Sequence, residues 1–225
     1  QNPVAELGAL CRERGVIFLV DAAQSAGSVP IDVEKMNIDL LAFPGHKGLY
    51  GLQGTGGLYV REGVDLAPLR HGGTGSHSEL PTQPDELPDR YESGTLNVPG
   101  LASLAAGVDY VTQTGVENIE RRESELTKKL IDGLSQIRGV TVYGAGNSGV
   151  VSLNIDGIAP SDAATILDGS FDIAARAGLH CAPDAHRTLG TLDLGGTLRL
   201  SVGAFNSDGD INAVLRAIDE IATGV

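Results

Sequence analysis

The chain has 225 residues, of which 41% are hydrophobic and 20% are charged, as is usual for a globular protein. Acidic residues outnumber basic ones by 29 to 16, and the resulting formal charge of −13 disfavours nucleic acids and membrane surfaces as partners. No run of about 18 apolar residues is present to span a membrane, and two cysteines, too few for a disulfide framework, predict a reduced, cytoplasmic protein.

The first part of the chain predicts a helix followed by buried strands. Apolar side chains recur at helical spacing between residues 3 and 14, namely Val4, Leu7, Leu10 and Cys11, so Cys11 is expected in the core. The apolar run at 16–20 lacks alternation, which is typical of a strand covered on both faces, and further apolar runs follow at 38–43 and 57–60. Helices that alternate with such strands predict an α/β domain.

Residues 63–100 predict a long loop. They lack periodicity and are rich in Gly, Pro, Ser and Thr. A loop of this length exceeds an ordinary connection, so we expect it to have a function. A helix over 101–111 is expected to close the first domain, which we place at residues 1–112.

The remaining residues, 113–225, predict a second, smaller domain. A long amphipathic helix over 115–138 turns these side chains inward: Ile119, Leu126, Leu130, Leu134 and Ile137. Strands are predicted at 140–143, 150–155 and 197–201, and helices at 161–168, capped by Ser161, and at 206–223.

Polar residues follow two of the predicted strands. Asp21 ends the first apolar run, and His46 and Lys47 lie between glycines just after the second. Ligands bind at the carboxyl ends of strands in open α/β sheets, although aspartate is also a common strand terminator. A lysine that loses solvation has a lowered pKa, as a Schiff-base nucleophile requires, whereas most lysines lie in surface loops. Position alone leaves both interpretations open.

Longer motifs occur in a fixed order along the chain. They are Asp-Ala-Ala-Gln at 21–24, Gly-His-Lys at 45–47, Gly-Gly-Thr-Gly-Ser at 72–76, Arg-Tyr-Glu-Ser-Gly-Thr-Leu-Asn at 90–97, Arg-Ala-Gly-Leu-His-Cys-Ala-Pro at 176–183 and Thr-Leu-Arg-Leu-Ser at 197–201. This series resembles the cysteine desulfurase/selenocysteine lyase branch of the class V aminotransferases over essentially the whole chain. The resemblance implies an α/β fold-type I pyridoxal phosphate enzyme, here the C-terminal part of its large mixed-sheet domain plus a small α+β C-terminal domain.

The resemblance also implies how the chain holds pyridoxal 5'-phosphate. Lys47 matches the lysine that forms the Schiff base and moves the substrate's Cα proton. Asp21 matches the carboxylate that keeps the pyridine nitrogen protonated, which makes the ring an electron sink. Gln24 and His46 match contacts to the ring's phenolic oxygen and to the phosphate side. Thr74 matches a residue that reaches the phosphate of the partner subunit, which implies a homodimer with shared active sites.

Cys181 decides which reaction is predicted. Its glycine-containing surroundings, with His180 adjacent and Arg176 upstream, favour the exposed thiolate that attacks sulfur. Arg199 matches the arginine that binds the substrate carboxylate, and we place Arg176 and Asn97 beside it as substrate contacts. The predicted reaction converts L-cysteine into L-alanine and a persulfide on Cys181, whose sulfur passes to an acceptor protein.

Three alternatives stay open. The protein is a selenocysteine lyase that acts on L-selenocysteine, an aminotransferase or epimerase in which Cys181 takes no part, or an inactive truncated fragment that serves dimerisation. No metal is expected, because the histidines at 71, 77, 180 and 186 form no tight ligand pair.

Relatives also carry an N-terminal half before the stretch that matches Gln1, with a phosphate-binding turn and a ring that stacks on the cofactor. We therefore expect the 225-residue chain alone to retain the cofactor weakly.

Overall fold

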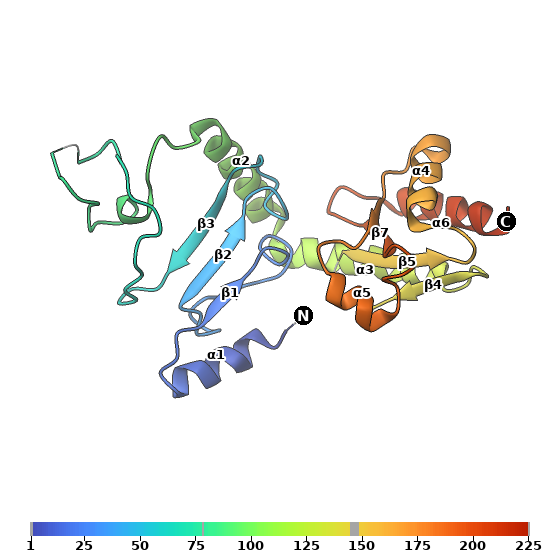
Figure 1. Cartoon of the computed structure of the whole chain (residues 1–225), viewed down its shortest axis with the longest axis horizontal. Coiled ribbons are helices and arrows are strands. Elements are labelled where there is room, and N and C mark those ends of the chain that lie inside the picture. Colours follow the sequence, from blue (N-terminus) through green and yellow to red (C-terminus); the bar gives the residue numbers. More distant parts are fainter. Residues whose placement is uncertain (1, 78, 145–148, 225) are drawn as a thin grey trace. The chain divides into compact units, whose positions relative to one another are not determined.

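The computed structural model describes residues 2–77, 79–144 and 149–224. The chain divides into two compact units (Figure 1), an N-terminal unit over Asn2–Glu117 and a C-terminal unit from Asn118 onward. The sequence-based domain boundary between residues 112 and 113 stays a prediction for the complete protein. No helix among the described residues is long and apolar enough to cross a membrane.

The N-terminal unit is built on a mixed sheet of three strands in the order β1-β2-β3. The strands are β1 (Leu19–Asp21), β2 (Leu40–Pro44) and β3 (Gly56–Val60), and the helices are α1 (Val4–Glu13) and α2 (Val98–Thr114). The pair β1–β2 is parallel and the pair β2–β3 is antiparallel. Ala22, Ile38 and Leu41 form the small buried core.

Two expectations for this unit are corrected. The strand predicted at 16–20 begins only at Leu19, and it is not covered on both faces, because the Leu19 side chain is 53% exposed and Val16 and Ile17 are more exposed still. The reason is that β1 is an edge strand, paired among the described residues only with β2. Cys11 is half-buried rather than in the core, since the face of α1 that it shares with Leu7 and Leu10 is incompletely covered.

The long loop between β3 and α2 is irregular apart from one short 3-10 helix, η1 (Asp89–Tyr91). Side-chain hydrogen bonds order it. The Gln83 amide donates to the carbonyl oxygens of Asp89 and Glu92 at 2.7 and 2.8 Å, and the Tyr91 hydroxyl donates to the Leu66 carbonyl at 2.9 Å. These hydrogen bonds hold the loop in a defined conformation, and its expected function stays a prediction.

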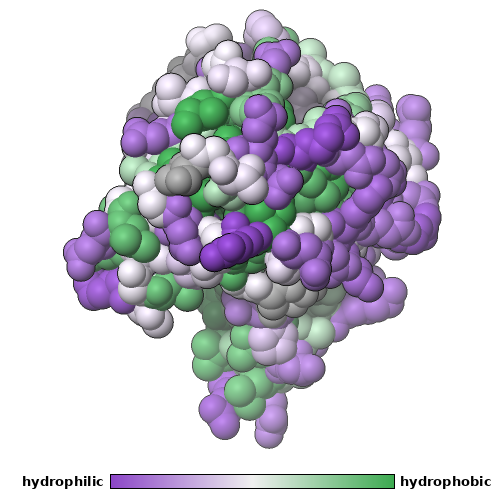
Figure 2. All heavy atoms as spheres, turned by 90° about the vertical axis from the view of Figure 1, so that its right-hand side faces the viewer, coloured by the Kyte–Doolittle hydropathy of each residue, from purple (hydrophilic) through white to green (hydrophobic). Residues whose placement is uncertain are grey.

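The C-terminal unit is built on an antiparallel sheet in the order β4-β5-β7-β6. Its strands are β4 (Val140–Tyr143), β5 (Val150–Ile155), β6 (Arg176–Gly178) and β7 (Thr197–Ser201), and its helices are α3 (Val116–Leu134), α4 (Pro160–Phe171), α5 (Pro183–Leu189) and α6 (Asp208–Thr223). Leucines of α3 pack against alternate residues of β5 and β7 and against α4 and α6. The face of the molecule seen in Figure 2 carries hydrophilic residues with hydrophobic ones interspersed among them.

The C-terminal unit follows its prediction closely. The strands expected at 140–143, 150–155 and 197–201 are confirmed with the same bounds, and Ile119, Leu126, Leu130 and Leu134 of α3 are buried as expected. The cap predicted at Ser161 is wrong, because α4 begins one residue earlier, at Pro160, and Ala159 is its N-cap. Alternation along β5 and β7 leaves one sheet face apolar and the other polar, and the polar face carries the candidate residues.

Candidate active site

One group of candidate residues lies at an edge of the first sheet. Because β1 and β2 are parallel, with Asp21 aligned with Ala42, their carboxyl ends meet at the same edge. The turns that follow the two strands touch. A side chain at Gly27, whose φ is +88°, would overlap the carbonyl of Gly48. The structure thus brings Asp21 and Gln24 of one turn to the same edge as His46 and Lys47 of the next.

The charges at this edge are available to a ligand. The side chains of Asp21, Gln24, His46 and Lys47 are all exposed. Asp21 Oδ1 accepts a hydrogen bond from the Ala23 N–H at 2.8 Å, which orients the carboxylate. In the part of the chain that the structure describes, neither Asp21 nor Lys47 forms an ion pair. An acid and an amine at one edge, each without an ionic partner, can both engage a bound molecule.

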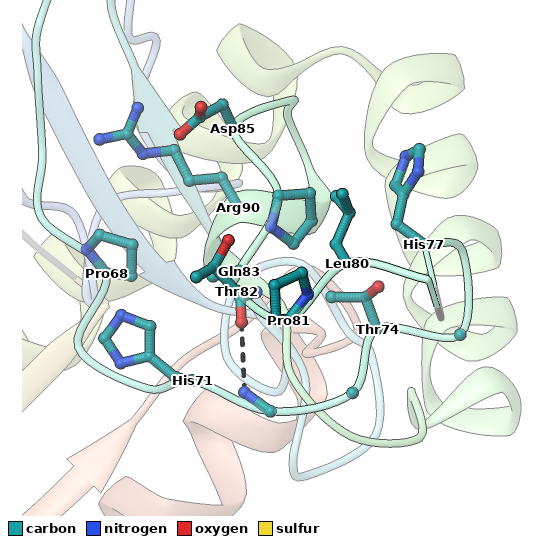
Figure 3. Close-up of a pocket in the computed structure, with 14 residues that line it drawn as sticks. Pro68, His71, Thr74, His77, Leu80, Pro81, Thr82, Gln83, Asp85 and Arg90 are labelled. Carbon is teal, nitrogen blue, oxygen red and sulfur yellow. Dashed lines mark hydrogen bonds between the residues drawn. The ribbon is translucent and has the colours of Figure 1, made fainter.

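Thr74 lies in a different place, in a cavity of about 680 Å³ formed by the long loop. The glycine-rich backbone at 72–75 forms one wall, and His71 and Arg90 lie across the opening from Thr74 (Figure 3). The Thr74 hydroxyl lies 3.0 Å from that of Ser76, and the Nε of Arg90 is buried without a hydrogen bond. The strand-edge residues are not among those that line this cavity, so this chain does not unite Thr74 with Lys47 in one pocket.

A third group lies on the polar face of the second sheet. Arg176 of β6 stands directly opposite Arg199 of β7, and Ser152 of β5 flanks Arg199 on its other side. Side chains opposite each other share a sheet face, and like charges in that arrangement repel. Within the described part of the chain, the Nε of half-buried Arg199 has no hydrogen-bond partner. Arg176 and Arg199 can together bind a carboxylate, because its negative charge offsets their repulsion and its oxygens accept hydrogen bonds from the guanidinium groups.

Cys181 follows β6 and is exposed. The preceding residue, His180, points its Nε2 at the Thr197 carbonyl oxygen of β7, 2.9 Å away. Burial lowers the pKa of His180, and the nearby charges of Arg199 and Arg176 lower it further. Cys181 therefore follows the carboxyl end of β6, and Arg176 and Arg199 are paired at the other end of this short strand. The charges of both arginines act on His180, the residue before Cys181.

Asn97 has a clear local task. Its side-chain oxygen accepts a hydrogen bond from the Gly100 N–H at 3.1 Å and caps α2. The residue belongs to the N-terminal unit, whereas Arg199 belongs to the C-terminal unit. Its expected contact with substrate stays a prediction.

The structure adds contacts that the sequence did not predict for two residues of the quoted motifs. Arg90 lines the cavity beside Thr74, and His180 bonds to β7. Both residues belong to motifs quoted above, but the sequence does not show which groups they contact. Among the described residues no group of three or more His, Cys, Asp or Glu side chains is placed to hold a metal ion.

Comparison with known proteins gives a consistent result. The family model described as aminotransferase class-V matches residues 1–214. A probable cysteine desulfurase of Methanothermobacter thermautotrophicus is 37% identical over 97% of this chain and 56% of its own length, and one of Pyrococcus abyssi is 39% identical over 98% and 56%. The chain spans about half the length of the curated relatives it matches.

Solved structures of similar proteins cover nearly the whole chain. The apo cysteine desulfurase of Thermococcus onnurineus has a TM-score of 0.84 at 36% identity, and the cysteine desulfurase CsdA of Escherichia coli, in an S-sulfonic acid form, has a TM-score of 0.86 at 30% identity. Each covers 99% of this chain, and this chain covers 56% of each. The predicted fold, part of a mixed-sheet α/β domain followed by a smaller α+β portion, is confirmed.

Proposed function

The chain belongs to the class V aminotransferase family, and from this premise we propose that it forms part of a pyridoxal 5'-phosphate-dependent L-cysteine desulfurase. One observation carries the proposal. Lys47 and Asp21, which form no ion pair among the described residues, share a strand edge. The same chain presents an exposed cysteine, Cys181, in the turn after β6, and β6 and β7 carry two arginines opposite each other. The names of the relatives support the same activity.

The strand edge fits the cofactor by the chemistry of its donors. Lys47 offers an exposed amine for a Schiff base, and Asp21 keeps one carboxylate oxygen beyond the one that bonds to Ala23. Gln24 and His46 are proposed to bond to the ring oxygen and to the phosphate side. When bound, the cofactor supplies an electron sink for the pair left on Cα after proton removal.

The residues of the chain then have distinct tasks in the proposed reaction. Arg199 and Arg176 hold the substrate carboxylate, with Asn97 as a further contact, and Lys47 removes and returns the Cα proton. Asp21 keeps the ring nitrogen protonated. The Cys181 thiolate donates an electron pair to the substrate sulfur, the carbon–sulfur bond breaks with its pair left on carbon, and protonation gives L-alanine. Cys181 is left as the persulfide.

The proposal includes partners. We place Thr74 at the cofactor phosphate of a second copy, so that a homodimer shares its sites. The long loop supports this with apolar side chains that lack cover in this chain, among them Leu69, 95% exposed, and Leu87. The exposure of Cys181 suits delivery of sulfur to an acceptor protein, and a free thiol in this role suits the reducing cytoplasm.

The test is turnover of L-cysteine by the cofactor-loaded protein in the presence of a reductant. Equal amounts of alanine and sulfide are expected, and Cys181→Ala should abolish both, while the control Cys11→Ala should leave them unchanged. A much higher rate with L-selenocysteine would identify a selenocysteine lyase instead. Activity on amino acids that survives Cys181→Ala would point to an aminotransferase or epimerase, and a protein that forms no cofactor absorbance band would be a non-catalytic fragment.

A further inference from the structure

The turn that carries Cys181 has an unusual backbone. His180 and Cys181 have φ values of +51° and +61°, both in the left-handed region. Residues with a Cβ visit this region rarely and as single residues, so two in succession persist only where the surroundings hold them. The structure must therefore contain an anchor for this turn.

The His180 ring provides that anchor. Its Nε2 lies 2.9 Å from the carbonyl oxygen of Thr197, a residue of β7 that is only 1% exposed. A carbonyl oxygen only accepts hydrogen bonds, so Nε2 carries the hydrogen and donates it. Within the turn, the Ala182 N–H donates to the Leu179 carbonyl at 2.9 Å. A buried strand thereby fixes a turn whose next side chain, Cys181, is exposed.

The groups around the His180 ring keep it neutral, with its hydrogen on Nε2. Nδ1 of His180 is buried and finds no hydrogen-bond partner among the described residues. The groups near the ring are Arg199 of β7, Arg176 of β6 and His186 of α5, whose ring centroid is 5.8 Å away. Burial lowers the pKa of His180, and although the hydrogen bond to Thr197 opposes this, the nearby positive charges lower the pKa further, so that it lies below its ordinary value. The ring therefore stays neutral to a lower pH than an ordinary histidine, with its hydrogen on Nε2.

We propose that His180 is a positioning residue for Cys181, which it serves by anchoring the strained turn to the Thr197 carbonyl and so holding the exposed thiol in one orientation. The inference rests on the proposed role of Cys181 as the sulfur acceptor. Attack on sulfur needs a defined approach, and a small misplacement of the nucleophile lowers the rate steeply. His180 itself exchanges no proton with substrate in this account.

Two substitutions of His180 test whether its hydrogen bond to Thr197, rather than the imidazole ring itself, holds the turn. The amide nitrogen of His180→Gln reaches the place of Nε2 and still donates, whereas His180→Ala cannot. The alanine variant is expected to lose about tenfold in kcat for alanine formation, the scale of one lost hydrogen bond, with little change in KM. The glutamine variant should keep most of the rate. Thr188→Val, which removes a hydrogen bond to the Asp184 carbonyl within α5, is the matched control and should be unchanged.

A second measurement does not depend on the reaction. Hydrogen exchange of the Ala182 amide reports the closed turn, and we expect about tenfold faster exchange in His180→Ala and no change in His180→Gln. Nitrogen NMR shifts of His180 should show the Nε2–H tautomer. An Nδ1–H tautomer, unchanged Ala182 exchange in the alanine variant, or a glutamine variant that loses as much as alanine would each overturn the proposal. A wild-type protein that makes no alanine would contradict the proposed function, and the exchange result would still decide whether His180 positions the turn.

Discussion

Asp39 is a buried carboxylate that ties together three segments of the first sheet. It is 4% exposed, its Oδ2 accepts a hydrogen bond from the Phe18 N–H at 2.8 Å, and its Oδ1 pairs with Arg61. Burial alone would raise the pKa of Asp39, but the hydrogen bonds from Phe18 and Arg61 outweigh it and hold the pKa below its ordinary value. Phe18 precedes β1 and Arg61 follows β3, so one side chain fixes the entry and exit of the sheet that presents Asp21 and Lys47.

Asp39→Asn is expected to lower the free energy of unfolding by about 1–3 kcal/mol, because the partly buried Phe18 N–H and the Arg61 guanidinium lose their charged acceptor. The matched control is Asp32→Asn, which removes an exposed carboxylate paired with Lys35 and should change stability little. Urea denaturation of both variants checks this. Equal effects at the two positions would show that burial of Asp39 does not matter.

The Asp39 contribution also has a defined pH dependence. Its pKa is lower in the folded than in the unfolded protein, so the unfolded state binds more protons in the interval between the two values. The contribution is complete above the unfolded pKa, near 4, and is lost as the pH falls through the lower folded value. The stability difference between wild type and Asp39→Asn should therefore shrink on acidification, and a difference that grows would contradict this assignment.

At the scale of elements, α6 depends on its N-terminal cap. The Ser207 hydroxyl accepts from the Asp210 N–H at 3.3 Å, and the Asp210 carboxylate accepts from the Ser207 N–H at 2.8 Å. Ser207→Ala should cost about 0.5–2 kcal/mol of stability. Ser161→Ala is the control, because Ser161 lies inside α4 and caps nothing. Thermal unfolding that ranks the two variants in the opposite order would contradict the helix starts described above.

The helices and strands show which sequence patterns are enough to predict an element and its bounds. The alternation of apolar and polar residues over 197–201 predicts β7 with its observed bounds, and the apolar segment 150–155 likewise predicts β5. The strand β6 was missed, because Arg176-Ala177-Gly178 has no apolar pattern and becomes a strand only by pairing with β7. The helix start at Ser161 was misjudged because Pro160 at the first helical position, favoured by its fixed φ, outweighed the serine.

At the scale of the whole molecule, the sequence supplied the candidate residues but not their grouping. Asp21 and Lys47 lie at the same edge of the sheet because β1 and β2 are parallel, and the spacing of the two residues in the chain does not reveal this pairing. Arg176 and Arg199 face each other through the register of β6 and β7. The anchoring contact of His180 was likewise invisible in the sequence, since it joins a turn to a backbone carbonyl 17 positions away.

The proposed homodimer makes a prediction about mixed dimers. If each site combines Lys47 of one copy with Thr74 of the other, a dimer of one Lys47→Ala copy and one Thr74→Ala copy contains one intact site. Random exchange of equal amounts of the two variants makes about half of the dimers mixed, and each mixed dimer has one of its two sites intact. About a quarter of the wild-type activity should therefore return, because the sites add independently. Subunit exchange must first be verified. If exchange occurs and no activity returns, both residues belong to the site of the same copy.

The central claim is that this chain uses Lys47 and a bound cofactor to load sulfur onto Cys181. Mass analysis of the Cys181 peptide, after cofactor-loaded protein is incubated with L-cysteine alone, tests it most directly. The account predicts that Cys181 gains one sulfur atom, that free alanine appears in equal amount, and that Lys47→Ala prevents both. Cofactor-loaded protein that leaves Cys181 unmodified and releases no alanine would contradict it.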